Sequence, residues 1–454
     1  MHAELSPRTD PVMSREHSSD GDGSRRPHLL LRARVVVPVA RPPILNGAVA
    51  IAAKRIRAVG PWKDFCGGHK VETVDLGDAI LLPGLVNAHC HLDYTAMAGE
   101  LPPLKRFTDW LKLITTSKSG LTYSDFAHSW LNGAAMLART GTTTVGDMEM
   151  VPELLPEVWT ATPLRVISFV EMTGVKSRRP AAEILHDAME FVRLLSHERC
   201  RIGLSPHAPY STAPELLRLS ARASREHDLR MATHVAESDQ EFEMFMHGRG
   251  EMFDWLARSK RDMSDCGLGS PVQHLERNGA LTQNLLAVHV NYLAPGDAAL
   301  LGKRKVHVVH CPRSHAYFKH RRFPLEELAL AGVNLCLGTD SLASVHQAGK
   351  QTAELNLFEE MRQLAGANPA VPPDIILQMA TVNGAHALGM QGQIGELSPG
   401  AFADLIAIPF AGKTAQIGEA ILHHKGGVAA SMIDGQWAVA PQETARNREA
   451  LAPA

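Results

Sequence analysis

Short apolar runs alternate with longer amphipathic stretches along most of this chain, and this alternation predicts the fold. Eight apolar runs have the length and composition of buried strands: Leu81–Ala88, Thr142–Asp147, Leu164–Met172, Arg201–Pro206, Arg230–His234, Leu285–His289, Val306–His310 and Val333–Asp340. Amphipathic segments such as Pro214–His227 and Phe323–Ala331 lie between them. Eight buried strands that alternate with helices predict a (β/α)8 barrel. A doubly wound open sheet is the alternative, but no GxGxxG motif follows the first strand.

The two ends of the chain have a shorter, β-like pattern. Strand-like runs lie at 29–37, 48–53 and 56–59, and the turn-rich segment after Ile394 resumes the same style. We therefore expect a small β-sandwich domain built from residues 29–82 and 393–440, which flanks a catalytic barrel of residues 83–392. Residues 1–28 are polar and aperiodic, which predicts a flexible extension, and residues 441–454 are expected to form a C-terminal tail.

The composition narrows the class of protein. The chain has 454 residues, 45% hydrophobic and 21% charged, with a net charge of -2. No basic field indicates nucleic-acid binding, no apolar run has the length of a membrane span, and no apolar leader begins the chain. The six cysteines are scattered without a CxxC pair, as is typical of reduced thiols. These features predict a cytoplasmic enzyme with a small-molecule substrate and neither nucleic-acid nor membrane partners.

Histidine or aspartate recurs where the predicted strands end. The positions concerned are His89, His91, His207, His234, His289, His310 and Asp340. A single histidine at a strand end is more often structural than catalytic. Barrel active sites lie at the carboxyl ends of the strands, so the joint placement predicts an active site there.

Four of these residues suit a metal ion. His89 and His91 end the first strand with one residue between them, so both point to the same side. With His234 and Asp340 they offer three imidazoles and a carboxylate, a set that fits one divalent ion, zinc or iron(II), with room for an activated water. Asp340 taken alone would be interpreted as a structural cap. Glu237 suits a proton shuttle beside that water, although it also belongs to an acidic run that could simply be solvated.

The chain resembles the amidohydrolase superfamily, in its branch of mononuclear-metal aminohydrolases that act on heterocyclic bases. The matching motifs are PGLVNAHCH (Pro83–His91), TGTTTVGD (Thr140–Asp147), SPHAPYS (Ser205–Ser211), THVAES (Thr233–Ser238), AVHVNYL (Ala287–Leu293), VVHCPRS (Val308–Ser314), LGTDSLAS (Leu337–Ser344) and IGELSPGAFADL (Ile394–Leu405). They extend over nearly the whole chain after Leu29. They are specific for the superfamily and this branch, and less so for a substrate.

The resemblance implies a role for each matching residue. The metal ligands would be His89, His91, His234 and Asp340. Glu237 would move a proton from water to a ring nitrogen, while His289 and Asp340 orient the attacking water. A bridging lysine of a two-metal site is expected at the end of the fourth strand, where Ser205-Pro206-His207 offers none, so one metal ion is favoured.

The resemblance also suggests substrate contacts. His207 would contact the heterocycle, and Trp110 would line the pocket, with a buried structural tryptophan as the alternative. His315 stands where many relatives have asparagine, and it is a candidate substrate contact together with Arg313, although both could be surface residues. Some relatives hold ribose hydroxyls with a glutamate after the equivalent of Trp110, but residues 111–120 contain no acid.

The function expected on these grounds is the replacement of a ring amino group by oxygen, with release of ammonia, in a purine-like heterocycle or nucleoside. The segments HCPRS and GTDSLAS resemble aminodeoxyfutalosine deaminases, and an adenosine-type substrate is the other leading choice. The alternatives are a hydrolase of another C–N or C–Cl bond, in a cyclic amide or triazine, and a non-catalytic barrel. The complete ligand set and Glu237 disfavour a non-catalytic barrel. Because members of the superfamily are often dimers or larger, a homo-oligomer is expected.

Overall fold

A computed structural model describes residues 27–66, 71–175, 179–347 and 353–442. Its centre is an eight-stranded parallel sheet in the order β13-β12-β11-β10-β9-β8-β7-β6. A parallel bridge between Cys90 and Asp340 joins the first strand of this sheet to the end of the last, so the sheet closes into the predicted (β/α)8 barrel.

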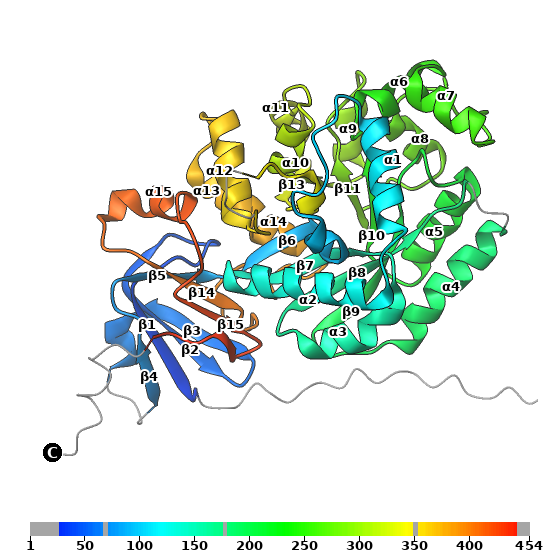
Figure 1. Cartoon of the computed structure of the whole chain (residues 1–454). Helices are drawn as coiled ribbons and strands as arrows, with labels where there is room; N and C mark the ends of the chain where they lie inside the picture. The colour runs from blue at the N-terminus through cyan, green and yellow to red at the C-terminus, as the bar shows by residue number, and fades with distance from the viewer. Residues whose placement is uncertain (1–26, 67–70, 176–178, 348–352, 443–454) are drawn as a thin grey trace, which may run out of the picture.

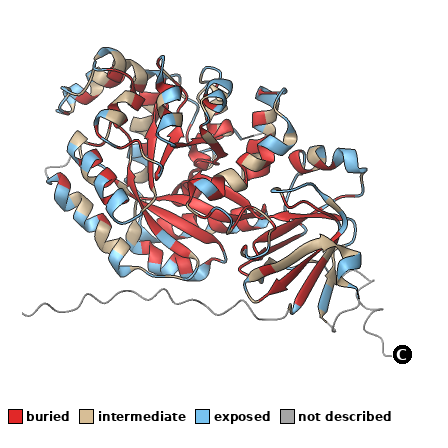
Figure 2. Ribbon diagram, turned by 180° about the vertical axis from the view of Figure 1, so that it is seen from behind, coloured by how far each residue is buried: buried red, intermediate tan, exposed pale blue. Residues whose placement is uncertain are grey.

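The barrel strands correspond closely to the predicted runs. They are β6 (Leu85–Cys90), β7 (Thr142–Glu149), β8 (Arg165–Met172), β9 (Cys200–Pro206), β10 (Met231–Val235), β11 (Leu285–His289), β12 (His307–His310) and β13 (Asn334–Leu337). Most of their residues are buried, and Figure 2 shows them in red at the centre of the molecule. Strands of a parallel barrel are covered on both faces, which explains the continuous apolar runs.

Helices cover the outside of the barrel and extend over one end (Figure 1). After the first four strands come α1 (Phe107–Lys118), α2 (Tyr123–Arg139), α3 (Leu155–Ala161), α4 (Ala181–Leu194) and α5 (Pro214–Glu226). The later helices are α6 (Asp239–His247), α7 (Glu251–Arg258), α8 (Pro271–Arg277), α9 (Asp297–Lys303), α10 (Pro312–Tyr317), α11 (Leu325–Leu330), α12 (Leu357–Ala367), α13 (Pro373–Met379) and α14 (Val382–Ala387). Within the part of the chain that the structure describes, no helix combines the length and apolar composition needed to cross a bilayer.

The small β-domain contains strands from both ends of the chain, as expected. Its strands are β1 (Leu29–Val36), β2 (Ile44–Ala52), β3 (Arg55–Pro61), β4 (Glu72–Asp75), β5 (Ala79–Pro83), β14 (Leu405–Pro409), β15 (Ala430–Ile433) and β16 (Gln436–Val439). Hydrogen bonds link them into one sheet that branches at β1, which pairs with both β4 and β5. Figure 1 shows the blue N-terminal strands beside the orange C-terminal ones, next to α15 (Ile417–Leu422).

The predicted strand Leu81–Ala88 is wrong in one respect, because the structure divides it at Gly84. Residues before this glycine belong to β5, which pairs antiparallel with β14 in the small domain, and residues after it belong to β6 of the barrel. A Cβ atom at Gly84 would lie 2.1 Å from the Thr143 hydroxyl on the neighbouring barrel strand β7, so the junction leaves no room for a side chain. The extension predicted at 1–28 and the tail predicted at 441–454 lie almost entirely outside the described residues.

Candidate active site

Four side chains from three strand ends converge at the carboxyl end of the barrel. The Nε2 atoms of His89 and His91 lie 3.6 and 3.7 Å from Asp340 Oδ1. The Nε2 atoms of His91 and His234 lie 3.3 Å apart. The structure therefore brings together the four residues that the sequence suggested as metal ligands.

The donor atoms have the spacing that one metal ion requires. Two ligand atoms at about 2.1 Å from a tetrahedral zinc ion lie about 3.4 Å from each other, close to the separations observed here. His89 is fully buried, yet neither of its ring nitrogens has a hydrogen-bond partner among the described residues. Buried nitrogens without partners are costly, and coordination would satisfy one of them. The residues present thus fit a divalent cation.

Hydrogen bonds outside the cluster fix the direction of two of these side chains. The Nδ1 atom of His234 lies 3.0 Å from the carbonyl oxygen of His207, so its Nε2 atom faces the cluster. Asp340 accepts hydrogen bonds from the Ser341 backbone N–H at 2.8 Å and from the Ser344 hydroxyl at 3.2 Å. Both contacts hold donor atoms in place before any ion binds.

The backbone around the cluster is strained. Four residues other than glycine have φ in the left-handed region: Ala236 (49°), His289 (76°), Val290 (51°) and Asp340 (55°). Such conformations cost free energy and persist where the surrounding structure enforces them, commonly at functional sites. Here they turn side chains toward the mouth of the barrel where the strands end.

Burial and neighbouring charges set the protonation of the cluster. Burial lowers the pKa of His234 to about 3, and the nearby imidazoles of His207 and His89 contribute. Burial, followed by the His89 ring, also holds the pKa of His91 well below its usual value. Burial opposes ionisation of Asp340, but the adjacent His89 ring and the other surrounding imidazoles hold its pKa well below the ordinary value. Neutral imidazoles and an ionised carboxylate are the forms that bind a metal.

Glu237 and His289 lie beside this cluster. Glu237 Oε1 is 3.5 Å from His289 Nε2, and single ligand-type atoms of Glu237, His289 and Asp340 lie within 4.8 Å of one another. Burial raises the pKa of Glu237 well above its ordinary value, and the charges of Asp340 and Glu241 add to this effect. Its backbone N–H donates to Glu241, and its carbonyl oxygen accepts from Asn291, so its position is fixed.

A cavity of about 500 Å³ opens above these residues. His207 and Trp110, both suggested as substrate contacts, lie in its wall. Sequence reasoning missed several lining residues, among them Tyr94, Lys118, Glu171, Tyr210 and Trp255. One signal was available: Glu171 is an acidic residue near the end of the apolar run that forms β8. The volume is in the range of small-molecule sites.

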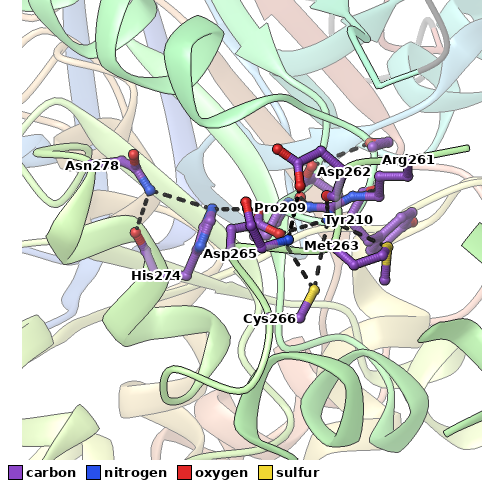
Figure 3. A network of polar contacts seen from close by, with 12 residues as sticks. Pro209, Tyr210, Arg261, Asp262, Met263, Asp265, Cys266, His274 and Asn278 are labelled. Atoms are coloured by element: carbon purple, nitrogen blue, oxygen red, sulfur yellow. Dashed lines mark hydrogen bonds and ion pairs between the residues drawn. The ribbon is translucent and has the colours of Figure 1, made fainter. Parts of the chain in front are cut away.

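A buried arginine supports one wall of the cavity. Arg261 donates to the carbonyl oxygens of Pro209 and Tyr210, both at 3.1 Å, and its charge is paired with Asp265 (Figure 3). These carbonyls lie two and three residues after His207, whose Nδ1 atom lies 2.6 Å from the hydroxyl of Ser211. The network holds the segment between β9 and α5 against the cavity.

Apart from His89, which belongs to the metal cluster, three of the residues that the sequence singled out do not line the cavity. Arg313 pairs with buried Glu360 on α12, and His315 Nδ1 lies 3.0 Å from Asn291 Oδ1, whose amide group binds the carbonyl of Glu237. His310 stacks on Phe323. Other protein side chains contact all three outside the cavity, and the substrate role of Arg313 and His315 stays a prediction from the sequence.

A barrel that collects three imidazoles, an aspartate and a separate glutamate at its carboxyl end defines a metal-dependent hydrolase. The model of the Amidohydrolase family matches residues 80–438, most of the chain. The protein belongs to this family.

Known relatives refine the class. The chain is 33% identical over 380 residues to 5-methylthioadenosine/S-adenosylhomocysteine deaminase of Syntrophobacter fumaroxidans, covering 80% of each chain. It is 32% identical to 5'-deoxyadenosine deaminase of Methanoregula boonei, over 74% of this chain and 72% of that one. An adenosine deaminase from Xanthomonas campestris, solved with bound zinc, superposes with a TM-score of 0.77 at 26% identity, over 90% and 92% of the two chains. The protein is therefore a metal-dependent deaminase, a hydrolase of carbon–nitrogen bonds in cyclic amidines.

Proposed function

We propose that this enzyme deaminates the purine ring of an adenosine-type nucleoside altered at its 5' position. The names of the relatives support this substrate, since both sequence relatives are named for adenosine derivatives that differ at that position. The cavity supports it as well, because aromatic and aliphatic side chains of α1 offer a flat apolar wall for a base. Aminodeoxyfutalosine, suggested by the motifs HCPRS and GTDSLAS, remains the second candidate.

One divalent metal ion would be held by His89, His91, His234 and Asp340. The nitrogen-rich donor set favours zinc, with iron(II) as the alternative, and zinc is bound in the Xanthomonas campestris structure. When bound, such an ion supplies Lewis-acid activation of a water molecule at neutral pH.

The observation that carries the proposed chemistry is the position of Glu237 beside Asp340 and His289. Its buried carboxylate can take a proton from water and deliver it to the ring nitrogen next to the carbon that is attacked. The raised pKa of Glu237 suits a group that must hold this proton before passing it on.

The other residues bind and orient. His289 and Asp340 orient the attacking water, and His289 stabilises the negative charge that develops during the attack. His207 donates or accepts a hydrogen bond at the heterocycle, and Trp110 packs against its face. Both side chains lie in the cavity wall, which supports these roles.

The rival reactions make different products. Hydrolysis of a triazine would release chloride or an alkylamine, and hydrolysis of a cyclic amide would open the ring. The relatives named as deaminases favour ammonia. A homo-oligomer, a cytoplasmic location and the absence of nucleic-acid partners stay predictions from the sequence.

The test is ammonia release by the zinc-loaded enzyme from adenosine, 5'-deoxyadenosine, methylthioadenosine, S-adenosylhomocysteine and aminodeoxyfutalosine, with cytosine, guanine and a chlorotriazine for comparison. Glu237→Gln should keep the metal and lose activity by about a hundredfold or more. Glu243→Gln is the matched control, since this residue belongs to the same acidic run but pairs with Arg249. Absence of ammonia from every nucleoside, or full activity in Glu237→Gln, would refute the proposal.

A further inference from the structure

Two charged side chains line the cavity without a part in the proposed chemistry. Lys118 ends helix α1, and Glu171 lies near the end of strand β8. Among the described residues that line the cavity, Lys118 is the one lysine or arginine, and Glu171 is the one acid besides Glu237 and Asp340. Neither charge is explained by the metal cluster.

Lys118 is placed by a helix face that follows the cavity. The residues of α1 that line it recur every three or four positions, as one side of a helix does: Phe107, Trp110, Leu111, Ile114, Thr115 and Lys118. This face is apolar near its start and ends in an ammonium group. Lys118 Nζ donates to the Tyr94 hydroxyl at 3.0 Å, and the Tyr94 ring stacks on His91 at 5.2 Å.

The ammonium group of Lys118 has unused hydrogen-bond donors. It carries three N–H donors, and within the described part of the chain it makes one hydrogen bond and no ion pair. Its charge reaches His207, because it contributes, after burial, to the lowered pKa of that histidine. Lys118 therefore lies within electrostatic reach of the residue expected to contact the heterocycle.

Glu171 is half-buried and has free acceptors. No described residue gives it a hydrogen bond or an ion pair, although a carboxylate has about four acceptor positions. After burial, its charge helps to raise the pKa of Tyr94 and Tyr210, both of which line the cavity. Glu171 and Lys118 thus share Tyr94 as a neighbour but form no ion pair with each other.

Two opposite charges that face one cavity without touching leave room for a ligand group between them. Partly buried charges lose hydration, and a ligand with complementary charge and hydrogen bonds restores it. An ammonium group binds a carboxylate, and a carboxylate accepts hydrogen bonds from a pair of hydroxyls or from an ammonium group. A nucleoside whose substituent ends in a carboxylate offers both partners at once.

We propose that Lys118 and Glu171 form a subsite that selects nucleosides bearing a carboxylate. Lys118 binds the carboxylate of the substituent, and Glu171 accepts hydrogen bonds from the ribose hydroxyls. This rests on the proposed function for the identity of the base. It also places a ribose-holding acid on β8, whereas the segment after Trp110 contains none.

Binding to the zinc-loaded Glu237→Gln enzyme tests the subsite without requiring turnover. S-adenosylhomocysteine and methylthioadenosine are a matched pair of thioethers that differ in the amino-acid group, and adenosine and 2',3'-dideoxyadenosine differ in the diol. In this background Lys118→Met should weaken binding of S-adenosylhomocysteine about tenfold to a hundredfold and leave methylthioadenosine unchanged. Glu171→Gln should weaken the binding of adenosine and leave the binding of 2',3'-dideoxyadenosine unchanged.

Controls separate charge from packing. Lys118→Arg should retain the preference for the carboxylate, and Lys303→Met, at the exposed end of α9, should change nothing. Should Lys118→Met fail to fold, Lys118→Gln carries the same comparison. Equal losses for both members of either pair would overturn the subsite. Absence of deamination by the wild-type enzyme, with these binding differences intact, would instead refute the reaction and leave the subsite standing.

Discussion

Asp340 Oδ1 lies 3.6 Å from His89 Nε2, and the backbone of Asp340 forms a parallel bridge with Cys90, the residue next to His89. One contact belongs to the metal cluster, and the other closes the barrel. Asp340 therefore contributes its side chain to the metal cluster and its backbone to the closure of the barrel between β6 and the segment after β13.

Asp340→Asn should weaken zinc binding by at least about tenfold, because an amide is a poorer ligand than a carboxylate. Removal of metal from the wild-type enzyme by a chelator should lower its unfolding temperature, since an ion that binds only the folded state stabilises it. Metal analysis and thermal unfolding measure both effects. Asp374→Asn, on the exposed side of α13, is the control. If a chelator left the unfolding temperature unchanged, the result would contradict the binding of a metal ion by this cluster.

Gly338→Ala should also impair metal binding, although Gly338 is not a ligand. A Cβ atom there would lie 2.8 Å from both Cβ and the carbonyl oxygen of His89, so the ligand strand would have to shift. Misplacement of a metal ligand by a few tenths of an ångström should reduce activity and metal content together. Gly366→Ala, at an exposed position of α12 where the new methyl group meets no neighbouring element, should be neutral or stabilising by up to about 1 kcal/mol. Wild-type metal content in Gly338→Ala would contradict this prediction, because it would show that the strand can shift without loss of metal binding.

Arg165→Met should destabilise the protein by about 3–5 kcal/mol, because it leaves buried Asp404 without its cationic partner and leaves Asp434 with Lys54 alone. Arg165 begins β8 of the barrel and binds Asp404 and Asp434 of the small domain at 3.0 and 3.2 Å. Its guanidinium also lies over the Phe402 ring. Urea unfolding measures the loss, and Arg222→Met, in an exposed pair with Glu226, should have no measurable effect. Equal midpoints for the two variants would mean that this link contributes little.

His274 should make stability depend on pH. Burial is the main cause that lowers its pKa to about 4 from an ordinary 6.5, while Asp265 opposes the shift. The unfolded chain therefore binds more protons between pH 4 and 6.5, so this part of the stability is complete above pH 6.5 and is lost as the pH falls toward 4. The loss should reach about 3 kcal/mol. His274→Gln should flatten the curve in that window, and an unchanged slope would exclude this residue as the cause.

The metal cluster was predictable because parallel strands bring their carboxyl ends to one edge, whatever the helices do. Lys118 was not, since the direction of α1 depends on how the helix packs over the barrel. The partner of Arg313 could not be predicted for a related reason. It follows a strand end, but Pro312 begins a short helix there, and this helix directs the guanidinium to Glu360. Position along a strand can be inferred from a pattern, whereas the path of the chain beyond the strand depends on packing.

The pairing of β5 with β14 has a consequence for folding during synthesis of the chain. Pro83 pairs with Leu405, so the N-terminal half of the small sheet leaves the ribosome long before its neighbour is made. At about 5–20 residues per second this interval lasts roughly 15–60 s. Throughout that time β5 has an open edge that could pair with a wrong strand. The domain that begins the chain is thus the last to be completed.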